Sequence, residues 1–217
     1  MNCIFGASGS AREIELLISR LVVSGDDSFR VTHFVVEDGN DQIGQIMKGC
    51  PVISETEFFT DHAHRDANCF LGFGSPVLRR TIVERLRSRA KVRFPTLIDP
   101  SVIFDRRLGG VCVGEGAIIC ANTTLTTDIE VGAFVQINNA STVAHDVRIG
   151  DFSTLSPGVH VSGNVTLHSG VFVGTGSVIL ERLEVAATTI IGAGATVARD
   201  IPEPGTYVGT PARRIAK

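Results

Sequence analysis

An aliphatic residue recurs at every sixth position of this 217-residue chain between residues 113 and 197, without a break. A second residue, mostly small or apolar, follows each of them after four positions. Neither the 3.6-residue period of an α-helix nor the two-residue period of a β-strand explains such a repeat. Hexapeptide repeats build parallel β-helices, so the pattern predicts that fold here. The recurring aliphatic residues are Val113, Ile119, Leu125, Val131, Ile137, Val143, Ile149, Leu155, Val161, Leu167, Val173, Ile179, Val185, Ile191 and Val197.

A longer period is superimposed on the hexads. Glycine follows the recurring aliphatic residue at Gly114, Gly132 and Gly150, and again at Gly174 and Gly192, with a step of 18 residues in each series. Three hexads therefore make one coil of triangular cross-section. We expect the aliphatic side chains to point inward and stack from coil to coil, with Gly, Asn and Asp at the corners, where the backbone must be permissive.

Composition limits the classes of protein to consider. A net charge of −3 without a basic stripe argues against a nucleic-acid partner. No apolar run approaches the roughly 18 residues that span a bilayer, and the first residues lack a secretory pattern, so we expect a cytoplasmic protein without a membrane partner. The five cysteines are odd in number and scattered, and none has the spacing of a zinc site, so we expect buried, reduced thiols.

The N-terminal part has the pattern of a nucleotide-binding βαβ unit. An apolar run over residues 1–5 stops at the turn Gly6-Ala7-Ser8-Gly9-Ser10, and residues 11–23 carry apolar side chains at helical spacing. The turn contains GxxG and not the full GxGxxG fingerprint, and many α/β turns use glycine for geometry alone. A second predicted strand, residues 29–36, ends in Glu37 and Asp38, which could hold the hydroxyls or base of a nucleoside or could form a solvated turn.

Further elements complete this α/β domain. We expect a loop at residues 49–53, a strand at 69–73, a helix at 76–89 and a strand at 93–98. Four arginines make the helix basic, either to serve a diphosphate or as a solvated face: Arg79, Arg80, Arg85 and Arg87. The predicted domains are a nucleotide-sugar-binding βαβ domain over residues 1–95 and a β-helix domain with a C-terminal tail over 96–217, in which residues 101–112 form an irregular first coil with a loop at 105–110.

His145 is the candidate catalytic residue. It occupies the third position of its hexad, so its side chain should point out of the prism, and Asp146 follows it directly. An imidazole can take a proton from an incoming amine or hydroxyl, and a neighbouring carboxylate can fix its tautomer. A lone surface histidine is usually inert, and it is the polar segment around this one that favours a catalytic role.

Several motifs together resemble the PglD/NeuD-type bacterial sugar acetyltransferases over essentially the whole chain. They are Gly6-Ala7-Ser8-Gly9, His145-Asp146, Ile149-Gly150-Asp151, Ser156-Pro157-Gly158, Ser162-Gly163-Asn164-Val165 and Val208-Gly209-Thr210-Pro211-Ala212-Arg213. The resemblance implies a Rossmann-like N-terminal domain, made of that βαβ unit, that binds a nucleotide-linked sugar, followed by a left-handed β-helix. It also implies a homotrimer, with acetyl-CoA bound between neighbouring β-helices and no metal.

The same resemblance assigns roles to individual residues. It implies that His145 is the general base, that Asp146 supports it, and that Asn138 lies near the sugar amine. For the pantetheine and adenosine parts of acetyl-CoA it implies contacts with Gly163, Thr175, Gly176, Gly192, Ala193 and Arg213. Thr154 is also expected to contact acetyl-CoA, although the chain departs from the family pattern there, since some members have a histidine near the thioester at this position. A second departure is Ser10, where others read Gly-His in the N-terminal turn.

Three functions remain open at this stage. The first is N-acetylation of a nucleotide-linked amino sugar, best a 4-amino-4,6-dideoxy sugar for glycan synthesis, by direct transfer. The second is O-acetylation of a sugar such as sialic acid. The third is a metal site like that of the gamma carbonic anhydrases, or a scaffold without activity. A zinc site needs several convergent ligands, whereas His160 and His168 fall on other faces than His145. A trimer would also cover Phe134 and Phe172, which we expect to be exposed.

Overall fold

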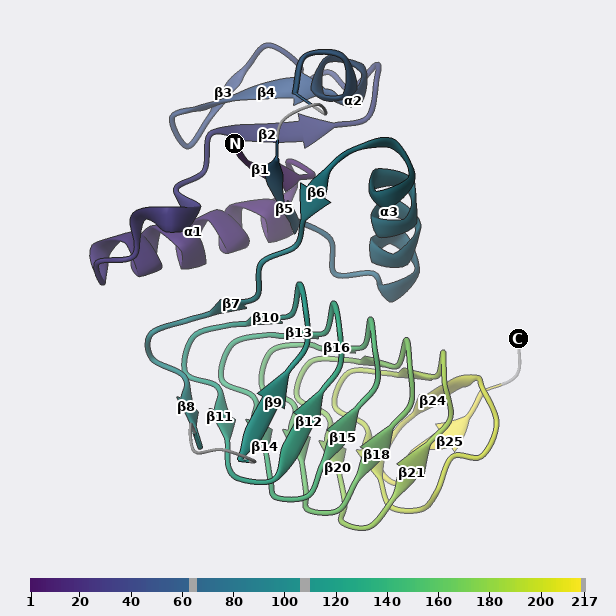
Figure 1. Cartoon of the computed structure of the whole chain (residues 1–217). Helices are drawn as coiled ribbons and strands as arrows, with labels where there is room; N and C mark the ends of the chain where they lie inside the picture. Colours follow the sequence, from purple (N-terminus) through teal and green to yellow (C-terminus); the bar gives the residue numbers. More distant parts are fainter. Residues whose placement is uncertain (63–65, 106–109, 216–217) are drawn as a thin grey trace. The chain divides into compact units, whose positions relative to one another are not determined.

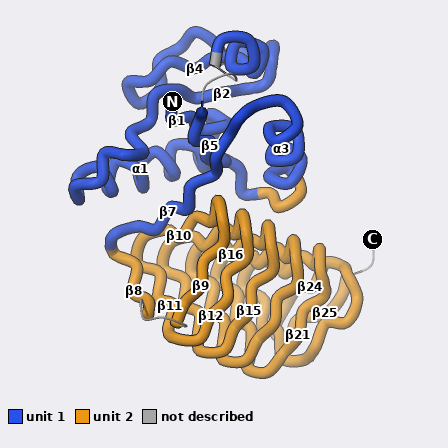
Figure 2. Tube along the Cα trace, in the orientation of Figure 1, with its two compact units in different colours: residues 1–74, 78–100 blue, residues 75–77, 101–217 orange. Residues whose placement is uncertain are grey.

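The computed structural model describes residues 1–62, 66–105 and 110–215 (Figure 1). The chain forms two compact units: residues 1–74 with 78–100, and residues 75–77 with 101–217 (Figure 2). The predicted boundary lies after residue 95, and the first unit extends to Pro100. None of the described helices is long and apolar enough to cross a membrane.

The first unit contains a six-stranded sheet in the order β3-β4-β2-β1-β5-β6. Neighbouring strands run parallel, except that β3 is antiparallel to β4. The elements are β1 (Asn2–Phe5), α1 (Gly9–Val23), η1 (Asp27–Phe29), β2 (His33–Val36), β3 (Ile46–Met47), β4 (Cys50–Ser54), α2 (Glu55–Glu57), η2 (Phe58–His62), β5 (Ala67–Leu71), α3 (Pro76–Arg89), β6 (Val92–Arg93) and β7 (Leu97–Ile98). The carboxyl ends of parallel strands share one edge of the sheet, which is where α/β proteins bind ligands.

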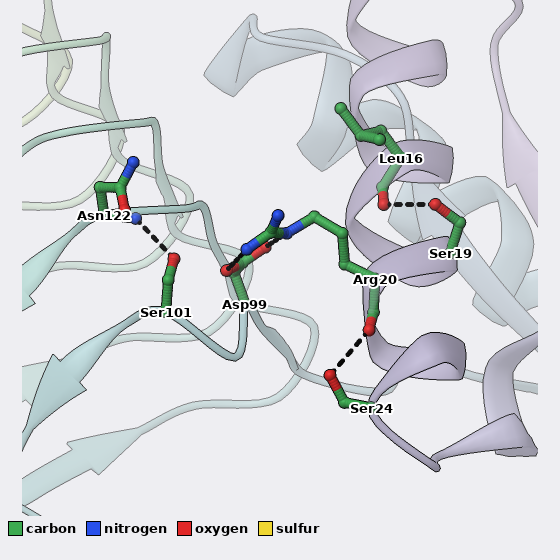
Figure 3. Close-up of polar contacts among 7 residues, drawn as sticks. All are labelled: Leu16, Ser19, Arg20, Ser24, Asp99, Ser101 and Asn122. Carbon is green, nitrogen blue, oxygen red and sulfur yellow. Dashed lines mark hydrogen bonds and ion pairs between the residues drawn. The ribbon is translucent and has the colours of Figure 1, made fainter.

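Helix α1 packs through one apolar stripe, because its buried residues follow helical spacing: Ala11, Ile14, Leu17 and Ile18. In its last turn, Arg20 holds the buried carboxylate of Asp99 from Nε at 2.6 Å and from Nη2 at 3.1 Å (Figure 3). The hydrogen bond to Asp99 and the charge of that carboxylate raise the pKa of Arg20. This bidentate pair fixes the end of the first unit. In the second unit, Ser101 accepts the backbone N–H of Asn122 (Figure 3).

Two expectations about this part of the chain are wrong. Residues 50–53 of the predicted loop at 49–53 belong to β4. The parallel ladder with β2 begins at Val52, so Pro51 precedes it and costs no ladder bond there. The cysteines are not all buried either. Cys3 is buried, and burial raises its pKa to about 12, but Cys112 is exposed.

The second unit is a parallel β-helix, as the hexads predict, and its strands form three faces. Between β9 and β23, each coil strand pairs with the strand 18 residues later, as Val143 does with Val161, and the step changes to 21 residues from β8 to β11 and to 16 from β22 to β24. Face 1 contains β10 (Ile118–Ile119), β13 (Gln136–Ile137), β16 (Thr154–Leu155), β19 (Phe172–Val173), β22 (Ile190–Ile191) and β24 (Thr206–Val208), followed by β25 (Arg213–Arg214). Face 2 contains β8 (Ile103–Phe104), β11 (Thr124–Leu125), β14 (Thr142–Val143), β17 (His160–Val161), β20 (Val178–Ile179) and β23 (Thr196–Val197). Face 3 contains β9 (Val111–Val113), β12 (Ile129–Val131), β15 (Arg148–Ile149), β18 (Thr166–Leu167) and β21 (Glu184–Val185).

One corner residue in each hexad adopts the left-handed backbone conformation. These residues are Gly116, Asn122, Asp128, Phe134, Ala140, Asp146, Phe152, Gly158, Asn164, Gly170, Gly176, Arg182, Thr188 and Gly194. Gly, Asn and Asp fill most corners, as predicted. Bulkier residues also occur there, and at Arg182, for example, the corner N–H donates to the carbonyl of Gly163 in the preceding coil, which offsets the cost of the conformation.

The beginning of the β-helix differs from expectation. The described residues between 101 and 112 are not all irregular, because Ile103 and Phe104 pair with β11 and residues 111–113 pair with β12. Of the predicted loop at 105–110, residues 106–109 lie outside the described part of the chain. Phe134 is 2% exposed, so the expectation that its ring is free is wrong, and it stacks on Phe152 with ring centroids 4.9 Å apart.

Candidate active site

The His145–Asp146 pair lies at the edge where face 2 turns into face 3. Both residues occupy the turn between β14 and β15, and Asp146 is the left-handed corner residue, with φ of 59°. The flanking Val143 and Val147 are buried inside the coil, which directs the two polar side chains outward. These side chains are 57% and 54% exposed, so a substrate can reach both. Exposed ion pairs contribute little to stability, so the fold does not depend on this pair. The pair can therefore serve a chemical role.

The hydrogen bond within the pair assigns the tautomer of His145. Its Nδ1 lies 2.7 Å from Oδ2 of Asp146. An ionised carboxylate only accepts hydrogen bonds, so Nδ1 carries the hydrogen, and in the neutral ring Nε2 then has the free lone pair. In a ring held in this way, Nε2 is the nitrogen that can accept a proton. The arrangement suits proton removal from an attacking nucleophile.

Gly163 lies directly beneath this imidazole, one coil further along the same edge. A Cβ at this position would be 2.7 Å from Cε1 and 2.8 Å from Nε2 of His145. Any larger residue would therefore displace the ring. The backbone supports this spacing as well, because Asn164 donates its N–H to the carbonyl of His145 at 2.9 Å.

A polar hollow of about 380 Å³ opens beside the pair on the face 3 side. Asp146 itself lines it, with Asp128 and Asn164 from the coils before and after. Arg148 and Glu130 form a long ion pair of 3.4 Å on its floor. The hollow therefore gives a small polar molecule room to approach the His145–Asp146 pair.

A different edge, between faces 1 and 2, carries other residues expected to bind acetyl-CoA. Thr175, Gly176 and Ala193 occupy turns of that edge and are exposed. His145 and Gly163 occupy the edge between faces 2 and 3. One chain therefore presents the expected cofactor residues on two separate edges.

The remaining expected residues of the second unit are mostly engaged within the fold. The Nδ2 of Asn138 donates to the carbonyl of Leu155 at 2.8 Å. Thr154 is 1% exposed and lies in β16, which pairs with β13 and β19 on face 1. The N–H and the carbonyl of Gly192 both form hydrogen bonds between coils. Arg213, in contrast, is exposed near the C-terminal end.

The first unit has its own hollow, of about 350 Å³, at the carboxyl ends of β1, β2 and β4. Gly6, Ser8 and Glu37 line it. Gly6 has φ of 104°, and a Cβ there would lie 3.0 Å from the ring of Phe73, so only glycine fits well. Ser8 precedes α1 without forming a side-chain cap, which leaves the first N–H groups of the helix open to an anion.

The other expected nucleotide residues divide by position. Gly9 and Ser10 are the first two residues of α1. Asp38 accepts hydrogen bonds from the N–H and the hydroxyl of Thr56, at 3.1 and 2.8 Å. These bonds lower the pKa of Asp38, and they engage its carboxylate within the unit.

Three charged residues of the first unit have roles that no sequence pattern indicates. Glu55 and Arg85 line the hollow of the first unit and form an ion pair of 2.6 Å. Arg79 is fully buried and donates from Nη1 to the carbonyls of Phe73 and Gly74, each at 3.0 Å. Burial lowers the pKa of Arg79 to about 10. Two of the arginines that make α3 basic, Arg79 and Arg85, are therefore engaged in contacts within the first unit.

The other coil histidines have separate partners. His160, on face 2, lies 2.8 Å from the hydroxyl of Thr142, and His168, on face 3, pairs with Glu184. Within the described ranges, no group of three His, Cys, Asp or Glu side chains is arranged to hold a metal ion.

Comparison with known proteins finds similar sequences and similar structures. No family model matches the chain. The acetyltransferase domain of PglB from Neisseria gonorrhoeae, solved with acetyl coenzyme A, is 26% identical with a TM-score of 0.84 and 98% coverage of each chain. PerB from Caulobacter crescentus, solved with CoA and GDP-perosamine, is 25% identical with a TM-score of 0.83, over 99% of this chain and 96% of that one. A GDP-perosamine N-acetyltransferase of Escherichia coli is 36% identical over 54% of this chain and 53% of its own length.

The second unit is thus a parallel β-helix of hexapeptide coils with an exposed His–Asp pair on one edge. The chain resembles hexapeptide-repeat acyltransferases in sequence and in fold. It spans between 27% and 62% of the length of the first three curated relatives that it matches.

Proposed function

We propose that this protein transfers the acetyl group of acetyl-CoA to the amino group of a nucleotide-linked sugar, of the 4-amino-4,6-dideoxy type, in bacterial glycan biosynthesis. The observation that carries the proposal is the exposed imidazole of His145, whose Nδ1 is held by Asp146 while Nε2 has no hydrogen-bond partner among the described residues. The complexes of similar proteins with acetyl-CoA and with GDP-perosamine support the two substrates. A left-handed coil and a cytoplasmic location belong to the same proposal.

The chemistry follows from the free nitrogen. The neutral amine of the sugar attacks the thioester carbonyl, and Nε2 of His145 takes the proton that the amine loses. The C–S bond then breaks, and the CoA thiolate leaves and takes up a proton from the imidazolium. In the described part of the chain, Asp146 is the side chain bonded to His145, with no serine or cysteine beside it. This favours direct transfer without an acyl-enzyme.

Backbone groups at the same edge can stabilise the oxyanion. The N–H of Gly163 has no partner among the described residues, whereas the neighbouring N–H groups of Ser162 and Asn164 are bonded to other coils. It lies beside the imidazole that removes the proton. A fixed donor at the developing oxyanion lowers the barrier to tetrahedral intermediates. We assign this role to Gly163.

A complete site requires two subunits. Thr175, Gly176 and Ala193 occupy a different edge from His145, so the two groups can face one groove only if they come from different chains. Face 2 lies between these edges, and its outward strand positions carry no formal charge: Thr124, Thr142, His160, Val178 and Thr196. The centres of protein interfaces are depleted of charged residues. A cyclic homotrimer built around face 2 brings the two edges together.

Subunit complementation tests this arrangement. We expect His145→Ala and Ala193→Trp each to be inactive, because the first removes the base and the second fills the opposite wall of the groove. Refolded as an equal mixture, they should recover about a quarter of wild-type activity, since half of the first edges and half of the second edges are intact and combine at random. Light scattering should report trimers in every sample, and an inactive trimeric mixture would show that one chain supplies both walls.

The first unit is proposed to hold the nucleotide in a Rossmann-like manner. The support is the parallel order of β4, β2, β1 and β5, the glycine turn after β1, and the uncapped start of α1. Phosphate oxygens at that helix terminus would accept the exposed N–H groups. Glu37, after β2, is placed for the ribose hydroxyls.

Initial-rate kinetics test direct transfer. Thiol release from acetyl-CoA, measured at several concentrations of a nucleotide-linked amino sugar, should give intersecting double-reciprocal lines, because both substrates must be bound before chemistry begins. Parallel lines would indicate an acyl-enzyme and contradict the proposal.

A further inference from the structure

The hollow of the first unit is lined by a partly buried ion pair between Glu55 and Arg85. Glu55 is 8% exposed at the start of α2, and Oε1 accepts from Nη2 of Arg85 at 2.6 Å. Burial raises the pKa of Glu55, while the charge of Arg85 acts in the opposite direction. The carboxylate is therefore poorly solvated, and further N–H donors would stabilise it.

Arg85 also has an unsatisfied donor at this place. Its Nε is buried and has no hydrogen-bond partner among the described residues. A buried N–H without an acceptor is destabilising, so an acceptor is expected from a bound molecule. Glu55 and Arg85 thus present a carboxylate beside an N–H donor, both lining one hollow.

The pair is placed to meet the base of a nucleotide. The strand order β4-β2-β1 puts Glu55, at the end of β4, two strands from the glycine turn after β1, or about 10 Å along the sheet edge. Gly6 and Ser8 of that turn line the same hollow. A nucleotide whose phosphates lie at the turn would extend its ribose and base over this distance.

We infer that Glu55 and Arg85 select guanine, so that the activated sugar is linked to GDP; this inference rests on the proposed function. Guanine presents O6 beside N1–H and the N2 amino group. O6 can accept from Nε of Arg85, while N1–H and N2–H donate to Glu55. Uracil and thymine place a second carbonyl where guanine has its amino group, and that oxygen would face the carboxylate. Adenine and cytosine reverse the donor and acceptor at the first two positions.

Calorimetric titration of the full chain with nucleoside diphosphates, in the absence of acetyl-CoA, tests the inference. We expect GDP to bind about 10–100-fold more tightly than UDP or dTDP, as one bidentate base contact provides. Inosine diphosphate lacks only the N2 amino group and should lose about tenfold relative to GDP. Equal or tighter binding of UDP would overturn the guanine assignment and leave the proposed function intact. Failure of every nucleotide to bind would instead contradict the nucleotide-linked acceptor.

A matched pair of variants locates the effect. Glu55→Gln should weaken GDP at least about tenfold and leave UDP nearly unchanged, because the amide has only one acceptor oxygen and introduces a competing donor. Glu57→Gln, an exposed change two residues away in α2, should preserve the wild-type preference. If Glu55→Gln keeps the full preference for GDP, the assignment is wrong. Should that variant not fold, the inosine diphosphate comparison on the wild type still decides the question.

Discussion

Replacement of His145 by alanine is expected to lower kcat by about 10²–10⁴-fold, the usual contribution of a positioned general base. The substitution should lower kcat more than the affinity for acetyl-CoA, because the imidazole acts on the acceptor amine. The side chain is exposed at a coil edge and contributes none of the internal stacking, so the fold should persist. Steady-state rates of thiol release, with thermal unfolding of the same samples, provide the measurement.

Asp146→Asn is the matched control for this variant. It leaves the base in place but replaces the carboxylate that fixes Nδ1–H by an amide, whose NH2 group can donate to Nδ1 and favour the other tautomer, so its kcat should lie between those of the wild type and His145→Ala. A folded, trimeric His145→Ala protein with nearly native kcat would refute the assignment. Proton removal by water or by the substrate would then be the account.

Replacement of Gly163 by alanine is expected to lower kcat by about 10²-fold, although it removes no functional side chain. The new Cβ would lie 2.7 Å from Cε1 of His145, so the ring must shift by a substantial fraction of an ångström. Displacement of a catalytic group by about 1 Å can cost that much. The backbone at Gly163 is not left-handed, so steric displacement of the ring is the dominant effect. Steady-state kinetics at saturating acetyl-CoA measure it.

A double-mutant cycle separates displacement of the ring from general damage. If Gly163→Ala acts through the imidazole, it should cost little in the His145→Ala background, where there is no ring to displace. Additive losses in the double variant would mean that Gly163 acts independently, for example by holding the thioester alone.

The repeat predicts the β-helix well because every coil obeys the same local rules. Aliphatic positions such as Val143 and Val161 stack in register, and corners such as Asp146 need a left-handed backbone. The exceptions lie where local rules are weak. Pro51 suggests a loop, yet it lies within β4, which tolerates it because the ladder with β2 starts one residue later. Phe134 has the position of a surface residue but stacks on another ring.

The candidate site is predictable only where its residues are adjacent in sequence. His145 and Asp146 are neighbours in the sequence, so the hexad pattern identifies both of them. Glu55 and Arg85 come from two different helices, 30 positions apart, and no spacing rule links them. Asp38 appears available in the sequence, but folding brings Thr56 to it and engages its carboxylate. The expected cofactor residues are divided between two edges, and this too can be recognised only from the geometry of the coils.

Identification of the product tests the central claim most directly. The purified protein should be incubated with acetyl-CoA and GDP-perosamine, and the nucleotide sugar analysed by mass spectrometry and NMR. We predict that one acetyl group is added, in an amide at the sugar nitrogen that survives mild base, and that His145→Ala gives almost none. A base-labile ester on free sialic acid, with no acetylation of any nucleotide-linked amino sugar, would contradict the account.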